Sequence, residues 1–385
     1  MAHKTLVGGT AYNITGGKSL VSGTAYDIKG GRTLISGTGY DIKFSRDPAY
    51  AMVYSDNSMV FQRGNEIETG KTLLASYTGF EEEEYTSSPW EAYRSNIVNV
   101  FFKDKVTPTS IACWFRNHNS LKNMNVANLN LAKTTNMSYA FATCYNLVGS
   151  PICGINVVNM IDTYSRCYNL TGSPICGSNV VNMHGAYYFC NNLTGSPVCG
   201  ENVNSMYGTY QECRKLTGSP VCGLNVVNLV FTYYNCFNLT GSPVCGNNVI
   251  NMYGAYYYCN NIIGNPICGS KVTNIKYAYY KSGSQNTGKN AYFYSASITN
   301  VQLCFGGKNY SKRLNIYVPM NSTTNTSIHY TNSSSLVGAT ITWTNAGTYQ
   351  YNTAYNLYIY PVANVAAAAI ANGDEEANAN AGITT

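Results

Sequence analysis

Apolar residues recur every 23 residues along the middle of this chain. Six consecutive copies, from Asn136 to Thr273, align without insertion or deletion. Each copy has a Met or Leu at its second position, an aromatic residue four positions later, a Cys three positions after that, and then a Leu or Ile. This spacing is typical of one helical face, whereas the following Pro-Ile/Val-Cys-Gly segment is typical of extended chain. Each copy is therefore predicted to form a helical turn or short helix followed by a short strand.

A unit of this length cannot enclose a core, so the copies must stack and bury the same columns of side chains in each neighbour. With a decaying seventh copy from Asn274, the pattern predicts an α/β solenoid, about 35 Å long at ~4.8 Å per copy. A proline in every copy opposes a continuous strand ladder, because it lacks a donor. Either the ladder is interrupted there or the strand begins just after the proline. These prolines are Pro151, Pro174, Pro197, Pro220, Pro243 and Pro266.

A shorter repeat occupies the start of the chain, where three 14-residue units begin at Thr5, Ser19 and Thr33. Each unit combines an apolar pair with Tyr-x-Ile between Gly-rich turns, which predicts small strands. Because isolated hairpins are marginal in water, residues 1–44 are expected to anchor the chain to a partner or to self-associate. The other expected segments are a solenoid cap at 45–135, the repeats at 136–282, a β-rich cap at 283–362, and an Ala-rich tail at 363–385 with one short helix before a loose end.

Two columns of cysteines run through the repeats. Their alternating spacing of 9 and 14 residues provides no Cys-x-x-Cys pair and no histidine partner, so neither a zinc site nor a redox site is predicted. We expect a structural ladder of reduced, stacked thiols, with disulfide bridges between the columns as the alternative. No cofactor is expected. The columns are Cys144, Cys167, Cys190, Cys213, Cys236 and Cys259, and Cys153, Cys176, Cys199, Cys222, Cys245 and Cys268.

Charge excludes several classes of function. The net charge of +6 is scattered and forms no basic stripe, so nucleic-acid binding is not expected. No apolar stretch approaches the ~18 residues of a membrane helix, so membrane insertion is not expected either. The acidic runs Glu81–Glu84 and Asp374–Glu376 are typical of solvated loops or tails. Early glycines at the N-terminus do not fit a secretory signal, which favours folding in a cytosol.

Catalytic patterns are weak. His3, His118, His184 and His329 lie outside any nucleophile, metal or acid–base motif. The acidic residues within the copies occupy different repeat positions, so paired carboxylates for glycan cleavage are not predicted. We therefore expect no enzyme, with a lyase or depolymerase left open.

Binding is better supported, because Tyr and Asn recur in every copy while charges are few. Tyrosine offers rigid contact area with one polar tip, which suits glycan or protein surfaces. The alternative is that each tyrosine packs against the neighbouring copy. The candidate binding residues are Tyr168, Tyr188, Tyr234, Tyr257 and Tyr258.

The order Ala/Thr-aromatic, Cys, Asn-Leu and strand, repeated every 23 residues, resembles the BspA-like leucine-rich-repeat surface proteins. The segments Ala49–Asn65, Ser87–Asp104 and Cys113–Phe115 look like that family's N-terminal cap, and Leu314–Pro319 resembles its last strand. The likeness covers roughly Ala49 to Pro361 and implies a leucine-rich-repeat fold. It departs from the family where Ser173 and the following proline replace an apolar strand residue.

The 14-residue units, from Thr5 to Ile42, resemble short repeats on virion proteins of tailed bacteriophages of gut bacteria. Together the resemblances imply a non-enzymatic virion protein, a head or tail fibre or decoration made in the host cytoplasm. It would display its solenoid on the virion surface and adhere to a host glycan or protein. Residues 1–44 would bind other virion proteins, and a homo-oligomer, a trimer as in phage fibres, is expected. The alternatives are a BspA-like adhesin on a bacterial cell surface and a purely architectural capsid or tail decoration.

Overall fold

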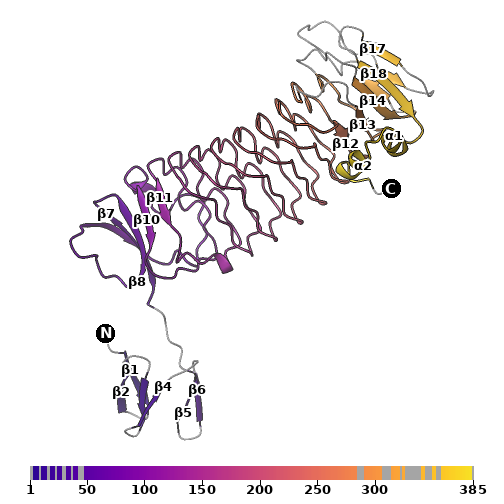
Figure 1. Ribbon diagram of the computed structural model, residues 1–385. Helices are drawn as coiled ribbons and strands as arrows, with labels where there is room; N and C mark the ends of the chain where they lie inside the picture. Colours follow the sequence, from indigo (N-terminus) through magenta and orange to yellow (C-terminus); the bar gives the residue numbers. More distant parts are fainter. Residues whose placement is uncertain are drawn as a thin grey trace. The chain divides into compact units, whose positions relative to one another are not determined.

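The computed structural model describes residues 47–283, 290–305, 314–320 and 358–383 in full, and only the backbone of the strands elsewhere. The described elements form a mixed α/β structure with several sheets and few, short helices (Figure 1). The chain divides into two compact units, Met1–Pro48 and Ala49–Thr385.

The first unit consists of three antiparallel strand pairs, one for each 14-residue repeat. The predicted short strands are therefore present. Thr5 pairs with Tyr12, Ser19 with Tyr26 and Thr33 with Tyr40, so the three units share one register. The pairs are β1 (His3–Val7) with β2 (Thr10–Ile14), β3 (Lys18–Val21) with β4 (Thr24–Asp27), and β5 (Arg32–Ile35) with β6 (Thr38–Asp41).

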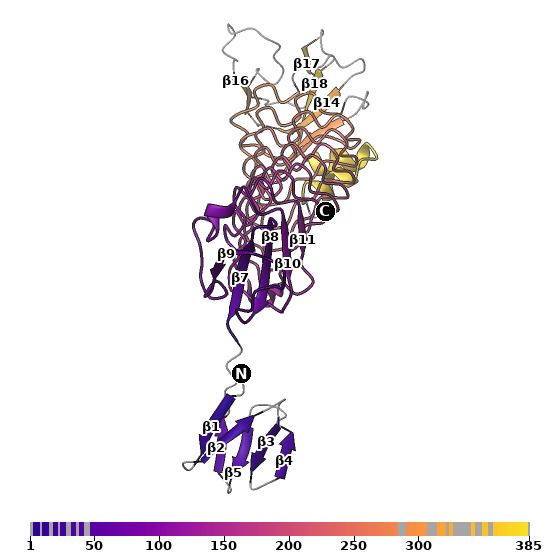
Figure 2. The same ribbon diagram turned by 90° about the vertical axis from the view of Figure 1, so that its left-hand side faces the viewer.

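The second unit begins with a five-stranded sheet of order β11-β10-β8-β7-β9, which Figure 2 shows strand by strand. A cluster of aromatic side chains packs under this sheet. The ring centroid of Trp114 lies 5.5 Å from that of Phe61 and 5.4 Å from that of Trp90. The elements are β7 (Ala49–Tyr54), β8 (Ser58–Arg63), β9 (Leu73–Tyr77), β10 (Asn99–Phe102) and β11 (Asn123–Asn125), with the 3-10 helices η1 (Glu91–Tyr93) and η2 (Leu131–Lys133).

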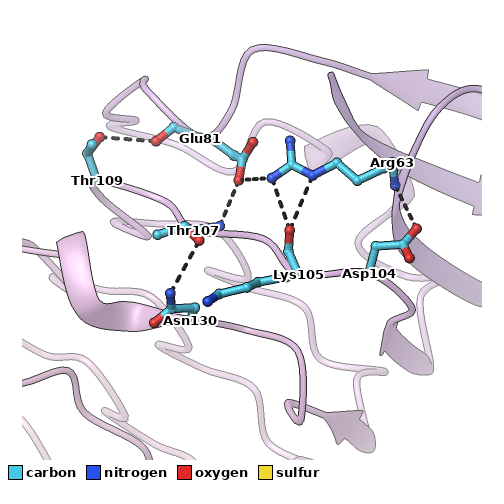
Figure 3. Close-up of polar contacts among 7 residues, drawn as sticks. All are labelled: Arg63, Glu81, Asp104, Lys105, Thr107, Thr109 and Asn130. Carbon is cyan, nitrogen blue, oxygen red and sulfur yellow. Dashed lines mark hydrogen bonds and ion pairs between the residues drawn. The ribbon is translucent and has the colours of Figure 1, made fainter. Parts of the chain in front are cut away.

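A polar network joins this sheet to the first repeats (Figure 3). Arg63 Nη2 lies 2.8 Å from Glu81 Oε1, and the same oxygen accepts a hydrogen bond of 2.7 Å from the Thr107 N–H. Asn130 in turn donates to Thr107 Oγ1. The prediction that Glu81 belongs to a solvated run is therefore wrong, because its carboxylate neutralises a partly buried arginine.

The 23-residue copies lie one upon the next (Figure 1) and are joined by parallel β-bridges at their first residues. The ladder starts one unit before the six aligned copies, at Ser110, and continues to Asn300. Alternate N–H groups cross between copies: those of Met137 and Phe141 donate to Asn159 and Thr163, both at 2.9 Å. The bridges are Ser110↔Asn136, Asn136↔Asn159, Asn159↔Asn182, Asn182↔Ser205, Ser205↔Asn228, Asn228↔Asn251, Asn251↔Asn274 and Asn274↔Asn300.

The first half of each copy is a series of turns and not the predicted helix. The Ala140 N–H closes a turn on Met137 O at 3.0 Å, whereas Tyr139 and Thr143 adopt left-handed backbone conformations with φ of 57° and 63°. Such residues direct every second N–H toward the next copy, which a right-handed helix would keep within itself. The apolar residues spaced four and then three positions apart therefore lie on a backbone of successive turns and not on a helix.

The second half of each copy has no strand ladder at its proline. The predicted short strand is therefore wrong for the described copies, except at β12 (Ile267–Cys268). The Tyr164 hydroxyl accepts from the Ile152 N–H at 2.9 Å and donates to the Ile152 carbonyl at 2.8 Å. A buried tyrosine of the next copy thus satisfies the residue after each proline, from Ile152 to Ile267. The ladder is interrupted at the proline, and this resolves the open register.

The interior consists of columns of Met or Leu, aromatic, Cys and Leu or Ile side chains. The aromatic column stacks face to face, with ring centroids 5.2 to 5.7 Å apart from Phe141 to Tyr279. All fourteen cysteines are free thiols. Those of the first column are buried, and each donates to a carbonyl of the preceding copy, as Cys167 Sγ does to Phe141 O at 3.1 Å. The second column is half-buried from Cys153 to Cys222 and buried at Cys245 and Cys268.

A second sheet, of order β12-β13-β14-β18-β17, follows the last copies. The Ala-rich segment folds back beside it as α1 (Val365–Ala371) and α2 (Glu376–Asn380) (Figure 1). Asp374 accepts from the Tyr292 hydroxyl at 2.6 Å, and Asn380 O accepts from the Cys245 N–H at 2.6 Å. The expected loose end is therefore wrong for the described part of the tail. The other strands are β13 (Asn290–Phe293), β14 (Leu314–Pro319), β15 (Thr323–Asn325), β16 (Thr340–Thr342), β17 (Tyr349–Asn352) and β18 (Leu357–Val362).

Candidate binding groove

Some positions of the copies are constant and others vary. With Asn136 as position 1, positions 2, 6, 9, 12, 14, 16, 18 and 19 keep one kind of residue in all six copies. Positions 3, 4, 7 and 8 differ in size, charge and polarity from copy to copy, as do positions 10 and 20. We call positions 3, 4, 7 and 8 the variable face. Position 3, for example, is Ser138, Ile161, His184, Tyr207, Val230 and Tyr253.

The variable face is hollowed. One hollow of about 550 Å³ and a second of about 350 Å³ share Gln211 and Phe231, so together they form one groove. Every lining residue occupies position 3, 4, 7 or 8 of its unit. The first hollow is lined by Gln211, Glu212, Phe231, Tyr234, Tyr253, Tyr257, Tyr277, Tyr280 and Leu303. The second is lined by Asp162, His184, Gly185, Tyr188, Tyr207, Gly208, Gln211 and Phe231.

One row of tyrosines in this groove presents its edges. Tyr234, Tyr257 and Tyr280 hold position 7 in consecutive copies and stack with centroids 4.5 and 4.7 Å apart, at 7° and 11° between planes. Because neighbouring rings cover each other's faces, the row offers ring edges and hydroxyl groups to a ligand. Two further lining rings, Phe231 and Tyr253, meet edge to face at 63°.

Glycine at position 4 makes room in the groove. Gly185 has φ of +60°, and a Cβ there would lie 2.2 Å from Asp162 Oδ1. Gly254 also has φ of +60°, and its Cβ would lie 2.6 Å from the Phe231 ring. The position-4 side chain of one copy therefore lies over the glycine of the next copy, which fixes Asp162 and Phe231 in place.

Burial and neighbouring side chains act on several polar groups of the groove. Burial, and then the neighbouring tyrosines, raise the pKa of Tyr257, so its hydroxyl stays protonated as a hydrogen-bond donor. Burial also raises the pKa of Asp162, against the opposing effect of His184. Glu212 is buried, lies 2.9 Å from Arg214 Nη2 and accepts a hydrogen bond from Asn235.

The structure brings together three of the five tyrosines expected to bind. Tyr188, Tyr234 and Tyr257 line the groove. Tyr258 lies beside it at position 8, with its ring 4.8 Å from that of Tyr257. Tyr168 is at position 10, stacks on Tyr145 at 5.1 Å and is not a lining residue. The alternative of packing between copies also holds, since the lining tyrosines stack on one another.

Twelve of the fifteen lining residues were not predicted from the sequence, among them His184, Tyr207, Phe231, Tyr253 and Tyr277. The signal that finds them is the comparison of the copies with each other: positions that change while their neighbours stay constant. His184, noted above only as lying outside any catalytic or metal motif, is exposed and stacks on Tyr207 at 4.5 Å.

Within the described residues, no three or more His, Cys, Asp or Glu side chains are grouped so that they could hold a metal ion. Likewise, no helix in the described part of the chain has the length and apolar character needed to cross a membrane.

The repeat stack and its hollowed face define a repeat protein with a groove lined by variable side chains. No protein-family model, curated protein or solved structure matches the chain. What the groove can do therefore follows from its own residues.

Proposed function

We propose that this protein is a non-enzymatic virion component, a fibre or decoration, whose repeats form a solenoid of leucine-rich-repeat type and adhere to a host-surface glycan or protein through the groove. The observation that carries the proposal is that every residue lining the groove occupies position 3, 4, 7 or 8, where side chains differ from copy to copy. A purely architectural stack has no physical need for such varied, largely aromatic side chains around one groove.

The chemistry of the groove favours binding over catalysis. Its walls supply tyrosine hydroxyls, the Gln211 amide and ring edges, which suit a ligand rich in hydroxyl groups. Of its two carboxylates, Glu212 is already engaged by Arg214 and Asn235. A glycan hydrolase requires one carboxyl group free as an acid and a second as base or nucleophile, and the pairing of Glu212 removes it from that work.

The virion setting is supported by the 14-residue units. Three strand pairs of four or five residues bury little surface alone, so a partner is needed to stabilise them. Attachment of many copies to one particle would present many grooves at once. Weak individual sites then act together, because each further contact is intramolecular.

The test is a cell-binding assay with the fluorescently labelled full chain on candidate host bacteria. We expect saturable binding that is lost after periodate treatment of the cells for a glycan, or protease treatment for a protein. Tyr257→Ala should weaken binding about tenfold by removing the middle ring of the stacked row. Leu224→Ala is the matched control, because this side chain is 71% exposed at position 20, away from the groove.

Loss of binding in the Leu224 variant as well would point to a general defect and not to the groove. Absence of binding by the wild-type protein on multivalent beads at micromolar concentration would overturn the adhesive function and leave an architectural decoration.

A further inference from the structure

Four cations of the variable face lie outside the linings of the two hollows, two toward the start of the stack and two toward its end. Arg116 holds position 7 of the unit that starts at Ser110, and Arg166 holds position 8 of the second aligned copy. Lys276 and Lys281 hold positions 3 and 8 of the unit that starts at Asn274. All four therefore belong to the variable face. Between them, the copies that carry Tyr234 and Tyr257 have no charged residue at these positions.

These cations rest on aromatic rings. Arg116 lies 4.8 Å from the Tyr139 ring centre and Arg166 5.9 Å from that of Tyr188. Lys281 lies 4.8 Å from the Tyr258 ring and donates to its hydroxyl at 2.7 Å. A ring face orients a cation but neutralises none of its charge.

Lys276 is held in the same way, 5.2 Å from the Tyr277 ring centre. In the contiguous described stretch 47–283, the ion pair formed within the repeats is Arg214 with Glu212, so none of the four ring-bound cations is in an ion pair there. Asp162, the second acid of the face, lies near Arg116 and Arg166 and loses part of its tendency to ionise through burial. The described part of the variable face therefore carries four cations against two carboxylates, one of which is already paired with Arg214.

We propose that the groove binds an acidic heteropolysaccharide in which carboxylate-bearing sugars are spaced by neutral sugars. The polymer lies along the stack: its neutral part meets the tyrosine hydroxyls, and its carboxylates meet Arg116 and Arg166 at one end and Lys276 and Lys281 at the other. The proposal rests on the proposed function, since it names the ligand class of the same groove.

The spacing of the charges follows from the stack. Arg166 and Lys281 hold the same position in units five copies apart, which corresponds to about 24 Å at ~4.8 Å per copy. A ligand with a charge on every residue would place anions opposite the uncharged centre. A neutral ligand would leave the terminal cations without partners. A polymer with widely spaced carboxylates fits both the uncharged central copies and the cations toward the two ends of the stack.

Single-stranded nucleic acid is the competing anionic polymer, and the ring geometry disfavours it. Proteins bind unpaired bases by stacking them on open aromatic faces and by tracking every phosphate with basic residues. Here the faces of Tyr257 are covered by Tyr234 and Tyr280. The centre of the groove carries no cation to follow a phosphate chain.

The test measures binding of the full chain to a panel of carboxylate-bearing heteropolysaccharides, xanthan, gellan and hyaluronan, each paired with its carboxyl-reduced form, and to poly(dT). We expect binding to at least one native polymer, about tenfold weaker binding to its reduced form, and weakening with added salt. Lys281→Gln and Arg166→Gln should each reduce affinity for the native polymer severalfold and leave the reduced form unaffected. Lys271→Gln, an exposed lysine at position 21 that bonds Asn248, is the control and should change neither.

Equal, salt-independent binding to native and reduced polymers would overturn the acidic ligand while the adhesive function stands. Stronger binding to poly(dT) than to any polysaccharide would overturn it in favour of nucleic acid. Binding to none of these polymers, combined with protease-sensitive cell binding, would reassign the groove to a protein ligand.

Discussion

Tyr256 and Tyr257 are adjacent in the chain and have the same side chain, but they make different kinds of contact. Tyr256, in the constant column, is fully buried, and its hydroxyl bonds both the N–H and the carbonyl of Val244, at 2.9 and 2.7 Å. Tyr257, on the variable face, is half-buried and stacks between Tyr234 and Tyr280. The difference lies in the partners: Tyr256 completes the backbone, whereas Tyr257 contacts other variable side chains.

This contrast explains which positions can change between copies. A residue whose polar atom satisfies a buried backbone group cannot vary, because its loss leaves that group unpaired at a cost of about 1–3 kcal/mol. A residue that touches only its equivalents in other copies can vary with little cost to folding. The copies therefore keep a scaffold constant and change a surface, and each prediction below separates the two.

The largest expected effect is on folding. Tyr210→Ala, in the constant column, should lower the free energy of unfolding by about 3–5 kcal/mol, because it empties a packed site and leaves Val198 without its hydroxyl partner. Tyr257→Ala should cost only about 1 kcal/mol, the value of a lost ring pair. Urea denaturation of both variants measures the difference. Equal losses would contradict the division into scaffold and surface.

Tyr210→Phe isolates the hydroxyl from the ring. Phenylalanine fits this column, as Phe141 shows. Phe141 needs no hydroxyl, because the N–H twelve residues earlier, that of Leu129, already donates to Val126 O at 2.9 Å. We expect a loss of about 1–3 kcal/mol for Tyr210→Phe and almost none for Tyr257→Phe. A neutral Tyr210→Phe would show that the hydroxyl bridge contributes nothing.

The second effect concerns a residue that differs from its column. His118 holds position 9 of the unit that starts at Ser110, where the six aligned copies have Cys. It is buried, its Nδ1 lies 3.1 Å from Arg116 O, and burial lowers its pKa below the usual 6.5, although nearby Glu91 opposes this. The folded protein therefore holds His118 neutral, while the unfolded chain binds a proton first as the pH falls.

Stability should consequently decline as the pH drops below about 6.5, by at most about 1.4 kcal/mol per pH unit for this one proton. Urea midpoints at pH 7.5, 6.5 and 5.5 measure the slope. His118→Cys, which installs the residue of the other copies, should flatten it between pH 6.5 and 5.5. An unchanged slope in this variant would assign the pH dependence to other groups.

The repeat itself and its buried columns could be predicted from the sequence, because apolar spacing and stacking constrain them strongly. The backbone of the first half could not, since residues such as Asp162 and Phe231 adopt left-handed conformations, with φ of 47° and 52°, that their side chains do not announce. Glycine at the same position of other copies, as at Gly185, was the available signal. Reading the copies together would have revealed it.

Comparison of the copies would also have improved the prediction of the candidate site. The tyrosines expected to bind were chosen one at a time, and Tyr168 was included although it lies outside the groove lining. The Ala-rich tail was expected to form one short helix before a loose end. It is held instead by polar contacts to residues far away in the chain, such as Asp374 with Tyr292, and pairs of that kind leave no periodic trace in a sequence.

The smallest expected effect is on reactivity and concerns the half-buried thiols of the second cysteine column. Cys153, Cys176, Cys199 and Cys222 should react slowly with iodoacetamide at pH 8.5, because burial raises the pKa of Cys153 and of Cys222 to about 11.

Cys245 should stay unlabelled in the intact chain, since the segment around Asn380 covers it. Deleting residues 374–385 should add Cys245 and Cys268 to the labelled set, as read by peptide mass spectrometry. Cys213, in the buried first column, reports on folding and should stay unlabelled in both proteins. If Cys245 reacts equally with and without the tail, the docked tail is not what separates the last copies from the first.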